Sequence, residues 1–332
     1  MGVYRPAQRG RCARHIRRHR SRHQEEAAMS QSTHHDIEFP APDGVTLRGV
    51  LYVPDRPGPH PAITMAHGYG AVKEMALLRL AATFAEAGFA VLVHDHRGFG
   101  ASDGTPRQDI DPWKQIADWR RALTYLESRP EVDADRIGLW GSSYAGGHAI
   151  VLGATEHRLK AVVAQVPTIS GFEQSRRRVA PDNIAALEAA LDADERGQLT
   201  GEAPRTQALV SADPAVPASY RAQDAVDFYL QELPEGTRWD NTVTVRSTRN
   251  ARMYEPGVFI ERVSPTPLLM IVGEQDTVTL TDTGLAAYNR ALEPKQLVML
   301  PGGHFAPYTT EFARASAAAT AFFRSHLAPS GE

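Results

Sequence analysis

A serine at a turn between a strand and a helix is the first residue in this chain that could do chemistry. Ser143 lies in Gly141-x-Ser143-x-Ala145, after an apolar run at 136–140 that predicts a strand and before a predicted helix at 144–155. A turn this tight strains its serine and needs small residues two positions away on either side. The pattern predicts a nucleophile, although a Gly/Ser-rich turn before a helix can also bind phosphate.

A serine hydroxyl becomes a strong nucleophile only when a base removes its proton and an acid orients that base. His304 follows the last predicted strand and Asp276 follows the penultimate one, so both lie at the sheet edge that carries Ser143. Glu274 and Asp282 compete with Asp276. Glu274 lies close to the strand end, however, and Asp282 fits the start of a helix. We therefore predict Ser143, His304 and Asp276 as nucleophile, base and orienting acid.

Backbone N–H groups must receive the negative charge that develops on an attacked carbonyl oxygen. The amide of Tyr144 directly follows the nucleophile, and the amide of Tyr69 lies in the turn His-Gly-Tyr-Gly that ends an earlier strand. Gly68 and Gly70 let this turn curl toward the serine. Tyr69 and Tyr144 are the predicted oxyanion-hole residues.

Histidines near these turns raise the alternative of a metal centre. His67, His94 and His96 are close in sequence, but no carboxylate or histidine recurs beside them at the i, i+4 spacing of a helical ligand pair. We expect no metal and no cofactor.

The elements that must position these residues alternate along the chain from His35 onward, as in a mostly parallel sheet covered by helices on both faces. Strands are predicted at 36–39, 45–53, 62–66, 89–93, 136–140, 159–166, 267–272 and 296–300. Helices are predicted at 74–87, 112–128, 144–155, 282–292 and 310–327, the second beginning with the capping pair Asp111-Pro112. These ranges predict an α/β core formed by residues 31–167 and 264–332.

The alternation stops between 168 and 263. This stretch is rich in Pro, Asp, Arg and Ala, with helical patterns at 183–191 and 222–232 and no clear parallel-strand run. We interpret it as a helical cap inserted over one end of the sheet. Its aromatic residues could roof a substrate or simply pack the cap onto the core: Phe172, Phe228, Tyr229, Trp239, Tyr254 and Phe259.

Residues 1–30 form a different kind of segment. The first 28 carry eight arginines and two glutamates, with no hydrophobic periodicity. A nucleic-acid tail or a transit peptide would fit, but we expect a disordered extension, with Met29 as the alternative start. The remaining chain has 28 basic and 37 acidic residues, a net charge of −9 that disfavours nucleic acid as a partner.

Cysteine usage and hydropathy set further limits. Cys12 is the single cysteine, so the core has neither disulfides nor a cysteine nucleophile. No apolar run is long enough to span a membrane, and we expect no membrane association.

Together these motifs resemble the α/β-hydrolase superfamily, in its dienelactone-hydrolase-like and esterase-peptidase-like branch, over residues 36–328. The resemblance rests on five motifs: His67-Gly68-Tyr69-Gly70, Asp95 to Ser102, Gly141 to Gly147, Gly273 to Asp276, and Gly303-His304. It implies an eight-stranded, mostly parallel sheet and the chain order Ser, Asp, His. The Asp95–Ser102 stretch is similar to a structural turn of these enzymes. Ala145 departs from the commoner glycine.

The predicted function is hydrolysis of a carboxylic ester or lactone through an acyl-enzyme on Ser143. An acyltransferase or thioesterase would use the same three residues, and a peptidase or a non-catalytic binding protein are further alternatives. The expected partner is a small-molecule ester, lactone or thioester, and a homo-oligomer is compatible with the sequence. Arginine outnumbers lysine 32 to 4, a composition typical of high-GC bacteria, so we expect a bacterial cytoplasmic enzyme.

Overall fold

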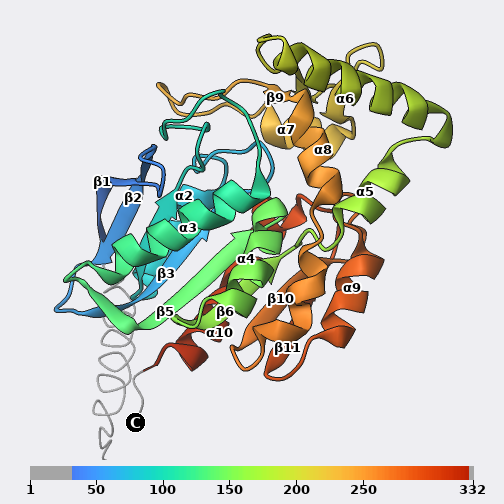
Figure 1. Cartoon of the computed structure of the whole chain (residues 1–332). Coiled ribbons are helices and arrows are strands. Elements are labelled where there is room, and N and C mark those ends of the chain that lie inside the picture. The colour runs from blue at the N-terminus through green and yellow to red at the C-terminus, as the bar shows by residue number, and fades with distance from the viewer. Residues whose placement is uncertain (1–31, 329–332) are drawn as a thin grey trace, which may run out of the picture.

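The computed structural model, which describes residues 32–328, is built around an eight-stranded sheet (Figure 1). The strands lie in the order β1-β2-β4-β3-β5-β6-β10-β11, and all pairs from β4 to β11 are parallel. Their bounds are β1 Ser32–Pro40, β2 Thr46–Pro54, β3 His60–Ala66, β4 Ala90–His94, β5 Val132–Ser142, β6 Leu159–Gln165, β10 Leu268–Gly273 and β11 Lys295–Leu300. The mostly parallel α/β sheet predicted from the sequence is confirmed. The predicted extension at 1–30 lies outside the described residues.

An antiparallel hairpin forms the edge of this sheet. Strands β1 and β2 pair antiparallel around the turn Pro42-Asp43-Gly44, where Gly44 has φ = 84°, a conformation that glycine adopts without strain. The parallel strands beyond it are buried on both faces and consist of near-continuous apolar residues, as expected for strands covered by helices.

Helices cover both faces of the sheet. One apolar cluster joins the sheet to α2 and α10, through residues such as Phe84 and Phe323, and the other joins it to α3, α4 and α9. The bounds are α2 Leu77–Glu86, α3 Pro112–Glu127, α4 Tyr144–Thr155, α9 Thr281–Arg290 and α10 Phe312–His326, with the short 3-10 helix η3 at Ala306–Tyr308. Helix α4 begins directly after β5, so its first turn lies at the carboxyl edge of the sheet.

Between β6 and β10 the chain forms the inserted segment, residues 168–263, which Figure 1 shows at the top of the molecule. Its helices are α5 Gly171–Arg178, α6 Ile184–Leu199, α7 Gln223–Tyr229 and α8 Val245–Met253, with 3-10 helices η1 Pro181–Asn183 and η2 Pro256–Val263. It also contains a three-stranded sheet, β8-β7-β9, from β7 Thr206–Val210, β8 Ala218–Tyr220 and β9 Thr242–Thr244. The expectation of a purely helical insertion was therefore incomplete, because strands of three to five residues are too short to show alternation.

The inserted segment is hydrogen-bonded to the loop that follows β3. The hydroxyl of Tyr229 donates to the carbonyl oxygen of Tyr69 at 2.7 Å, and the indole N–H of Trp239 donates to that of Gly70 at 2.8 Å. Leu209 packs so closely on Gly70 that a Cβ there would lie 2.8 Å from its methyl group. Residues of the insertion thus hold the loop that carries one predicted oxyanion donor.

No helix within residues 32–328 combines the length and the apolar character needed to cross a membrane.

The start of α3 tests whether Asp111 caps this helix, as its sequence predicts. The Asp111 side chain accepts hydrogen bonds from the amides of Trp113 (3.0 Å) and Lys114 (3.2 Å), which lack partners within the helix. Asp111→Ala should lower the free energy of unfolding by about 1 kcal/mol, and Asp111→Ser should recover most of that loss. Urea denaturation of the three proteins measures this. Equal stability of wild type and Asp111→Ala would contradict the assigned cap.

Candidate active site

Ser143 occupies a strained turn between β5 and α4. Its backbone has φ = 57° and ψ = −121°, a conformation that a residue with a side chain adopts only when its surroundings impose it. A Cβ on Gly141 would lie 2.2 Å from the carbonyl oxygen of Ala145, so this position requires glycine. The Ser143 amide donates to the carbonyl of Gln165 on β6 at 2.9 Å, which fixes the turn to the neighbouring strand. The side chain is thereby held out at the sheet edge.

A chain of hydrogen bonds links Ser143 to the two other predicted residues. His304 Nε2 lies 2.9 Å from Ser143 Oγ, and His304 Nδ1 lies 2.8 Å from Asp276 Oδ2. Because the carboxylate can only accept, Nδ1 carries the proton and leaves Nε2 free to take one from the serine. The three residues are 8%, 3% and 5% exposed, so the whole chain is shielded from bulk water.

The Asp276 carboxylate is held by its own loop as well as by the histidine. Its Oδ1 accepts from the amides of Val278 and Thr279, both at 2.8 Å, and its Oδ2 accepts from the Thr279 hydroxyl at 2.7 Å. Burial alone would raise the pKa of Asp276, but the adjacent His304 and the Thr279 donors outweigh it and lower the pKa to about 2. The carboxylate is therefore charged at any pH near neutrality.

The two competing carboxylates lie elsewhere. Glu274 is exposed at the end of β10, and Asp282 is in the first turn of α9, where it pairs with Arg177 at 2.9 Å. Asp282 is not the helix cap that the sequence suggested, since the residue at that position is Leu280. Only Asp276, of these three, contacts His304.

The loop after β3, which carries the Tyr69 amide, packs directly against Ser143. A Cβ on Gly68 would lie 2.9 Å from Ser143 Cβ, so only glycine allows this approach. His67 Nδ1 lies 3.1 Å from the Gly68 carbonyl oxygen. That carbonyl belongs to the same peptide unit as the Tyr69 N–H, and the two groups point in opposite directions. Within residues 32–328, neither the Tyr69 nor the Tyr144 amide donates to a protein acceptor, which leaves both available to a ligand oxygen.

Buried histidines surround this loop. His67 Nε2 accepts from the backbone amide of His96 at 3.1 Å, and burial lowers the pKa of His67, which keeps the ring neutral. Burial likewise lowers the pKa of His94 and of His148 to about 3. No group of three or more His, Cys, Asp or Glu side chains in the described part of the chain is arranged to hold a metal ion. The expectation of a metal-free site stays a prediction.

The Asp95–Ser102 stretch supports the loop after β3 through hydrogen bonds. Asp95 is fully buried and accepts from the Lys73 ammonium at 2.7 Å, the Lys73 amide at 2.9 Å and the Ala101 amide at 3.0 Å. The Ser102 hydroxyl donates to the Asp95 carbonyl at 2.7 Å. These bonds join the turn after β4 to the loop after β3.

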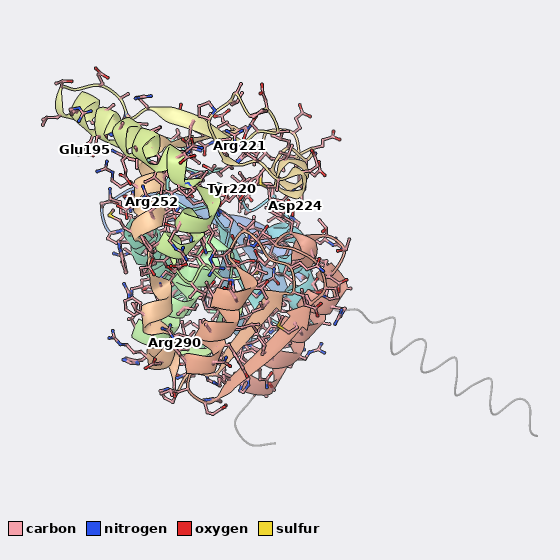
Figure 2. The ribbon with its side chains drawn as sticks, turned by 90° about the vertical axis from the view of Figure 1, so that its right-hand side faces the viewer. Glu195, Tyr220, Arg221, Asp224, Arg252 and Arg290 are labelled. Carbon is pink, nitrogen blue, oxygen red and sulfur yellow. The ribbon has the colours of Figure 1, made fainter. Side chains whose placement is uncertain are left out.

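A narrow cavity lies beside the serine, with space for little more than a water molecule. The core contributes Met75, Leu77 and Tyr308, and the inserted segment contributes Phe228 and Tyr229. Asp224 Oδ2 of the inserted segment lies 3.6 Å from the position of a Cβ on Gly303, the residue before His304, and Figure 2 labels Asp224 and Tyr220 where the insertion meets the core. The aromatic residues of the insertion therefore divide between the two predicted roles. Some line the cavity beside the serine, and others pack the insertion against the core.

Several site residues were not found from the sequence. Thr279 donates a hydrogen bond to Asp276. The only sequence feature that could have indicated it is the Asp-x-x-Thr spacing after a strand, which is weak. Ser142, Gln165 and the half-buried Tyr308 form a second hydrogen-bond network beside the nucleophile, with Tyr308 Oη 2.5 Å from Ser142 Oγ. Nothing in the local sequence links Ser142 to a tyrosine 166 positions away.

Comparison with known proteins identifies the family of this chain. The model of the X-Pro dipeptidyl-peptidase (S15) family matches residues 43–306. The quorum-quenching protein AidA of Acinetobacter baumannii is 34% identical over 83% of this chain and 89% of its own. The thiohydrolase aneE of Aspergillus aculeatus is 32% identical over 80% and 85%.

The polyketide transferase grgF of a Penicillium species is 32% identical over 81% of this chain and 88% of its own. The crystal structure of the α/β hydrolase GrgF from Penicillium has a TM-score of 0.76 with this fold, at 29% identity, and covers 89% of this chain and 99% of that one. The chain belongs to the S15 family of α/β hydrolases.

Proposed function

We propose that this enzyme cleaves a carboxylic ester or lactone through an acyl-enzyme on Ser143, with His304 as the base and Asp276 as its orienting acid. The observation that carries the proposal is the buried Ser143–His304–Asp276 chain, with separations of 2.9 and 2.8 Å, ending on a strained serine. Such geometry is costly to maintain and is typical of a nucleophile.

The mechanism follows from the positions of the donors and acceptors. Ser143 Oγ attacks the carbonyl carbon while His304 Nε2 takes its proton, and the resulting imidazolium is stabilised by Asp276. The amides of Tyr69 and Tyr144 receive the negative charge on the carbonyl oxygen. His304 then gives its proton to the leaving alkoxide, and the acyl group remains on Ser143. His304 then takes a proton from a water molecule as the water oxygen attacks this ester, and returns the proton to Ser143 Oγ as the acyl–oxygen bond breaks, which releases the acid and the free serine.

A second function is transfer of the acyl group to an acceptor other than water. The apolar side chains of Phe228 and Tyr229 line the space beside Ser143, and an apolar surrounding that limits bulk water slows hydrolysis of an acyl-enzyme. Two relatives are named a thiohydrolase and a polyketide transferase, which supports thioesters as a further substrate class. The peptidase alternative has only the name of the family model in its favour.

The remaining expectations are also proposals. We take the partner to be a small-molecule ester, lactone or thioester, and the inserted segment to act as a cap over the site. The arginine-rich, cysteine-poor composition supports a bacterial cytoplasmic enzyme. Assembly into a homo-oligomer, without nucleic acid or membrane as partners, is compatible with the chain's acidic body.

Ser143→Ala should lower turnover of p-nitrophenyl acetate by about 10⁴-fold or more, because the nucleophile is lost. It should also abolish covalent labelling by a fluorophosphonate. Ser325→Ala removes a hydroxyl that only bonds within α10 and serves as the matched control. Full turnover by Ser143→Ala, with labelling retained, would show that the nucleophile is another residue.

Asp276→Asn should lower kcat by about 10⁴-fold, because the amide favours the wrong imidazole tautomer.

Since the pKa of Asp276 is held at about 2, any acidic limb of kcat/KM above pH 4 arises from another group. The stability that this carboxylate contributes is present above its ordinary pKa near 4 and is lost as pH falls toward 2. The difference in urea midpoint between wild type and Asp276→Asn should therefore shrink over that interval. A difference that stays constant from pH 5 to pH 2 would contradict the lowered pKa.

Competition between water and a second nucleophile separates hydrolysis from transfer. With p-nitrophenyl octanoate and added 1-propanol or N-acetylcysteamine, product analysis by mass spectrometry gives the ratio of transfer product to free acid. A ratio above the molar ratio of added nucleophile to water indicates a site that selects against water. Formation of free acid alone would favour simple hydrolysis.

A further inference from the structure

The loop after β11, residues 301–309, carries the base and is joined to the nucleophile turn, residues 141–147, by two hydrogen bonds. Among residues 32–328, no other hydrogen bond connects these two stretches. One of the two is the bond between base and nucleophile. The other joins the hydroxyls of Tyr308 and Ser142, which lie 2.5 Å apart. The distance from base to nucleophile therefore has one hydrogen-bonded support that takes no part in the chemistry.

Ser142 is a well-fixed anchor for this bond. It is buried at the end of β5, where its Oγ accepts from Gln165 Nε2 at 3.2 Å and donates to the Gln165 carbonyl at 3.3 Å. With the proton of Ser142 given to that carbonyl, Tyr308 is the donor in the bond to Ser142 Oγ. The same Gln165 carbonyl accepts from the Ser143 amide. Tyr308 thus connects the base loop to the residue of β6 that also holds the nucleophile.

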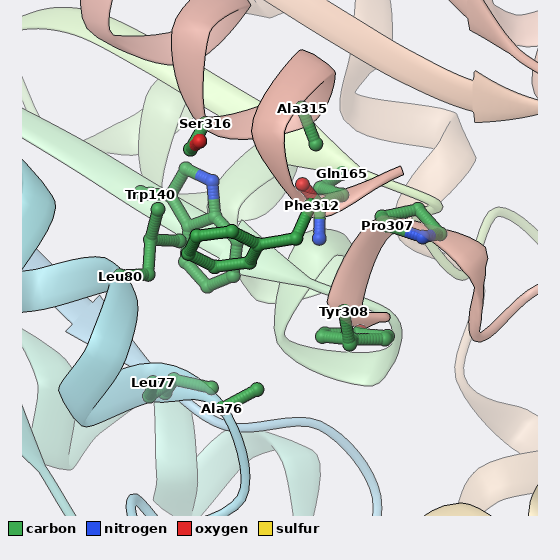
Figure 3. A pocket seen from close by; sticks show the side chains of 10 residues that line it. All are labelled: Ala76, Leu77, Leu80, Trp140, Gln165, Pro307, Tyr308, Phe312, Ala315 and Ser316. Atoms are coloured by element: carbon green, nitrogen blue, oxygen red, sulfur yellow. The ribbon is translucent and has the colours of Figure 1, made fainter. Parts of the chain in front are cut away.

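Packing by itself leaves the Tyr308 ring room to shift. The ring is half-buried, and its centre lies 5.0 Å from that of Phe228 in the inserted segment. Tyr308 also borders a small gap in the packing, together with Gln165, Pro307 and Phe312 (Figure 3). This gap has room for about one water molecule. The hydrogen bond to Ser142 is therefore what sets the position of the Tyr308 hydroxyl end.

We propose that Tyr308 is a positioning residue, which keeps His304 within reach of Ser143 through its hydrogen bond to Ser142. The proposal rests on the function proposed above. It matters most after acylation, because Ser143 Oγ then carries the acyl group and has no proton to donate to His304. The Tyr308–Ser142 bond is unchanged at that stage, and it holds the base loop in place for the attack of water.

Tyr308→Phe keeps the ring and removes only the bond. Ser142 retains both of its bonds to Gln165, so the variant leaves no buried hydroxyl without a partner. Its kcat/KM for p-nitrophenyl acetate should fall about tenfold with little change in KM, because a misplacement of about 1 Å costs up to about 100-fold. The rate of fluorophosphonate labelling should fall in parallel. Tyr288→Phe alters a half-buried tyrosine of α9 that lines neither cavity, and it should match wild type.

Two double variants show whether the loss acts through this bond and through the base. Ser142→Ala removes the same bond from its other side, so Ser142→Ala/Tyr308→Phe should lose no more activity than the weaker of the two single variants. His304→Ala has no base left to position, so adding Tyr308→Phe should leave its residual turnover unchanged. A contact of the Tyr308 hydroxyl with the substrate, or a general loosening of the site, would still lower that turnover. Urea denaturation establishes the conditions under which every variant is folded.

Three results would each overturn the positioning role: full activity of Tyr308→Phe, additive losses in Ser142→Ala/Tyr308→Phe, or an equal loss when Tyr308→Phe is added to His304→Ala. Failure of the proposed function has a different signature, because wild type itself would then show neither ester turnover nor fluorophosphonate labelling. In that case the role of Tyr308 falls with the reaction that it serves.

Discussion

The strained backbone of Ser143 is the constraint on which the rest of the site depends. Its φ of 57° is maintained by bonds from several elements: its amide donates to Gln165 on β6, and its carbonyl accepts from Gly146 of α4 and from Thr168, where the inserted segment begins. Gly141 and Gly68 supply the space that the turn needs on either side. Strain of this kind persists only when the surroundings over-determine it. The close packing of β5, β6 and α4 therefore does more than bury apolar area, because it sets the position from which the hydroxyl reaches His304.

Much of this arrangement can be predicted from the sequence because parallel strands obey simple rules. The parallel strands appear as apolar runs, and residues that directly follow parallel strands must meet at one edge, which brings Ser143, Asp276 and His304 together without any distance information. Glycines at 68 and 141 mark close approaches, and Asp111-Pro112 marks a helix start. For Gly141 and Asp111 the signal is local, since the residue and the backbone feature it serves lie within a few positions of one another, whereas Gly68 marks its turn locally but approaches Ser143, which is distant in the chain.

The features that could not be predicted depend on partners that are distant in the chain. Ser142 bonds Tyr308, Lys73 bonds Asp95, and Tyr229 bonds the Tyr69 carbonyl, at separations of 166, 22 and 160 positions. No periodicity relates such pairs; only the finished packing selects them. The three-stranded sheet of the inserted segment was missed for a similar reason, since β8 and β9 have three residues each and are stable only through pairing with β7. Sequence analysis thus selected the three side chains that the structure brings together, but not the network that constrains them.

The hydrogen bonds from Tyr229 and Trp239 to the loop after β3 couple access to reactivity. Phe228 and Tyr229 of the inserted segment line the narrow cavity beside Ser143, so a shift of this segment away from the core would widen it. That shift would break the bonds to the Tyr69 and Gly70 carbonyls, and so would release the loop that presents the Tyr69 amide. A molecule that binds but keeps the inserted segment from returning to the core would then contact Ser143 while the loop carrying the Tyr69 amide is incompletely ordered. The enzyme would discriminate between substrates at the closing step, by induced fit, as well as by initial affinity.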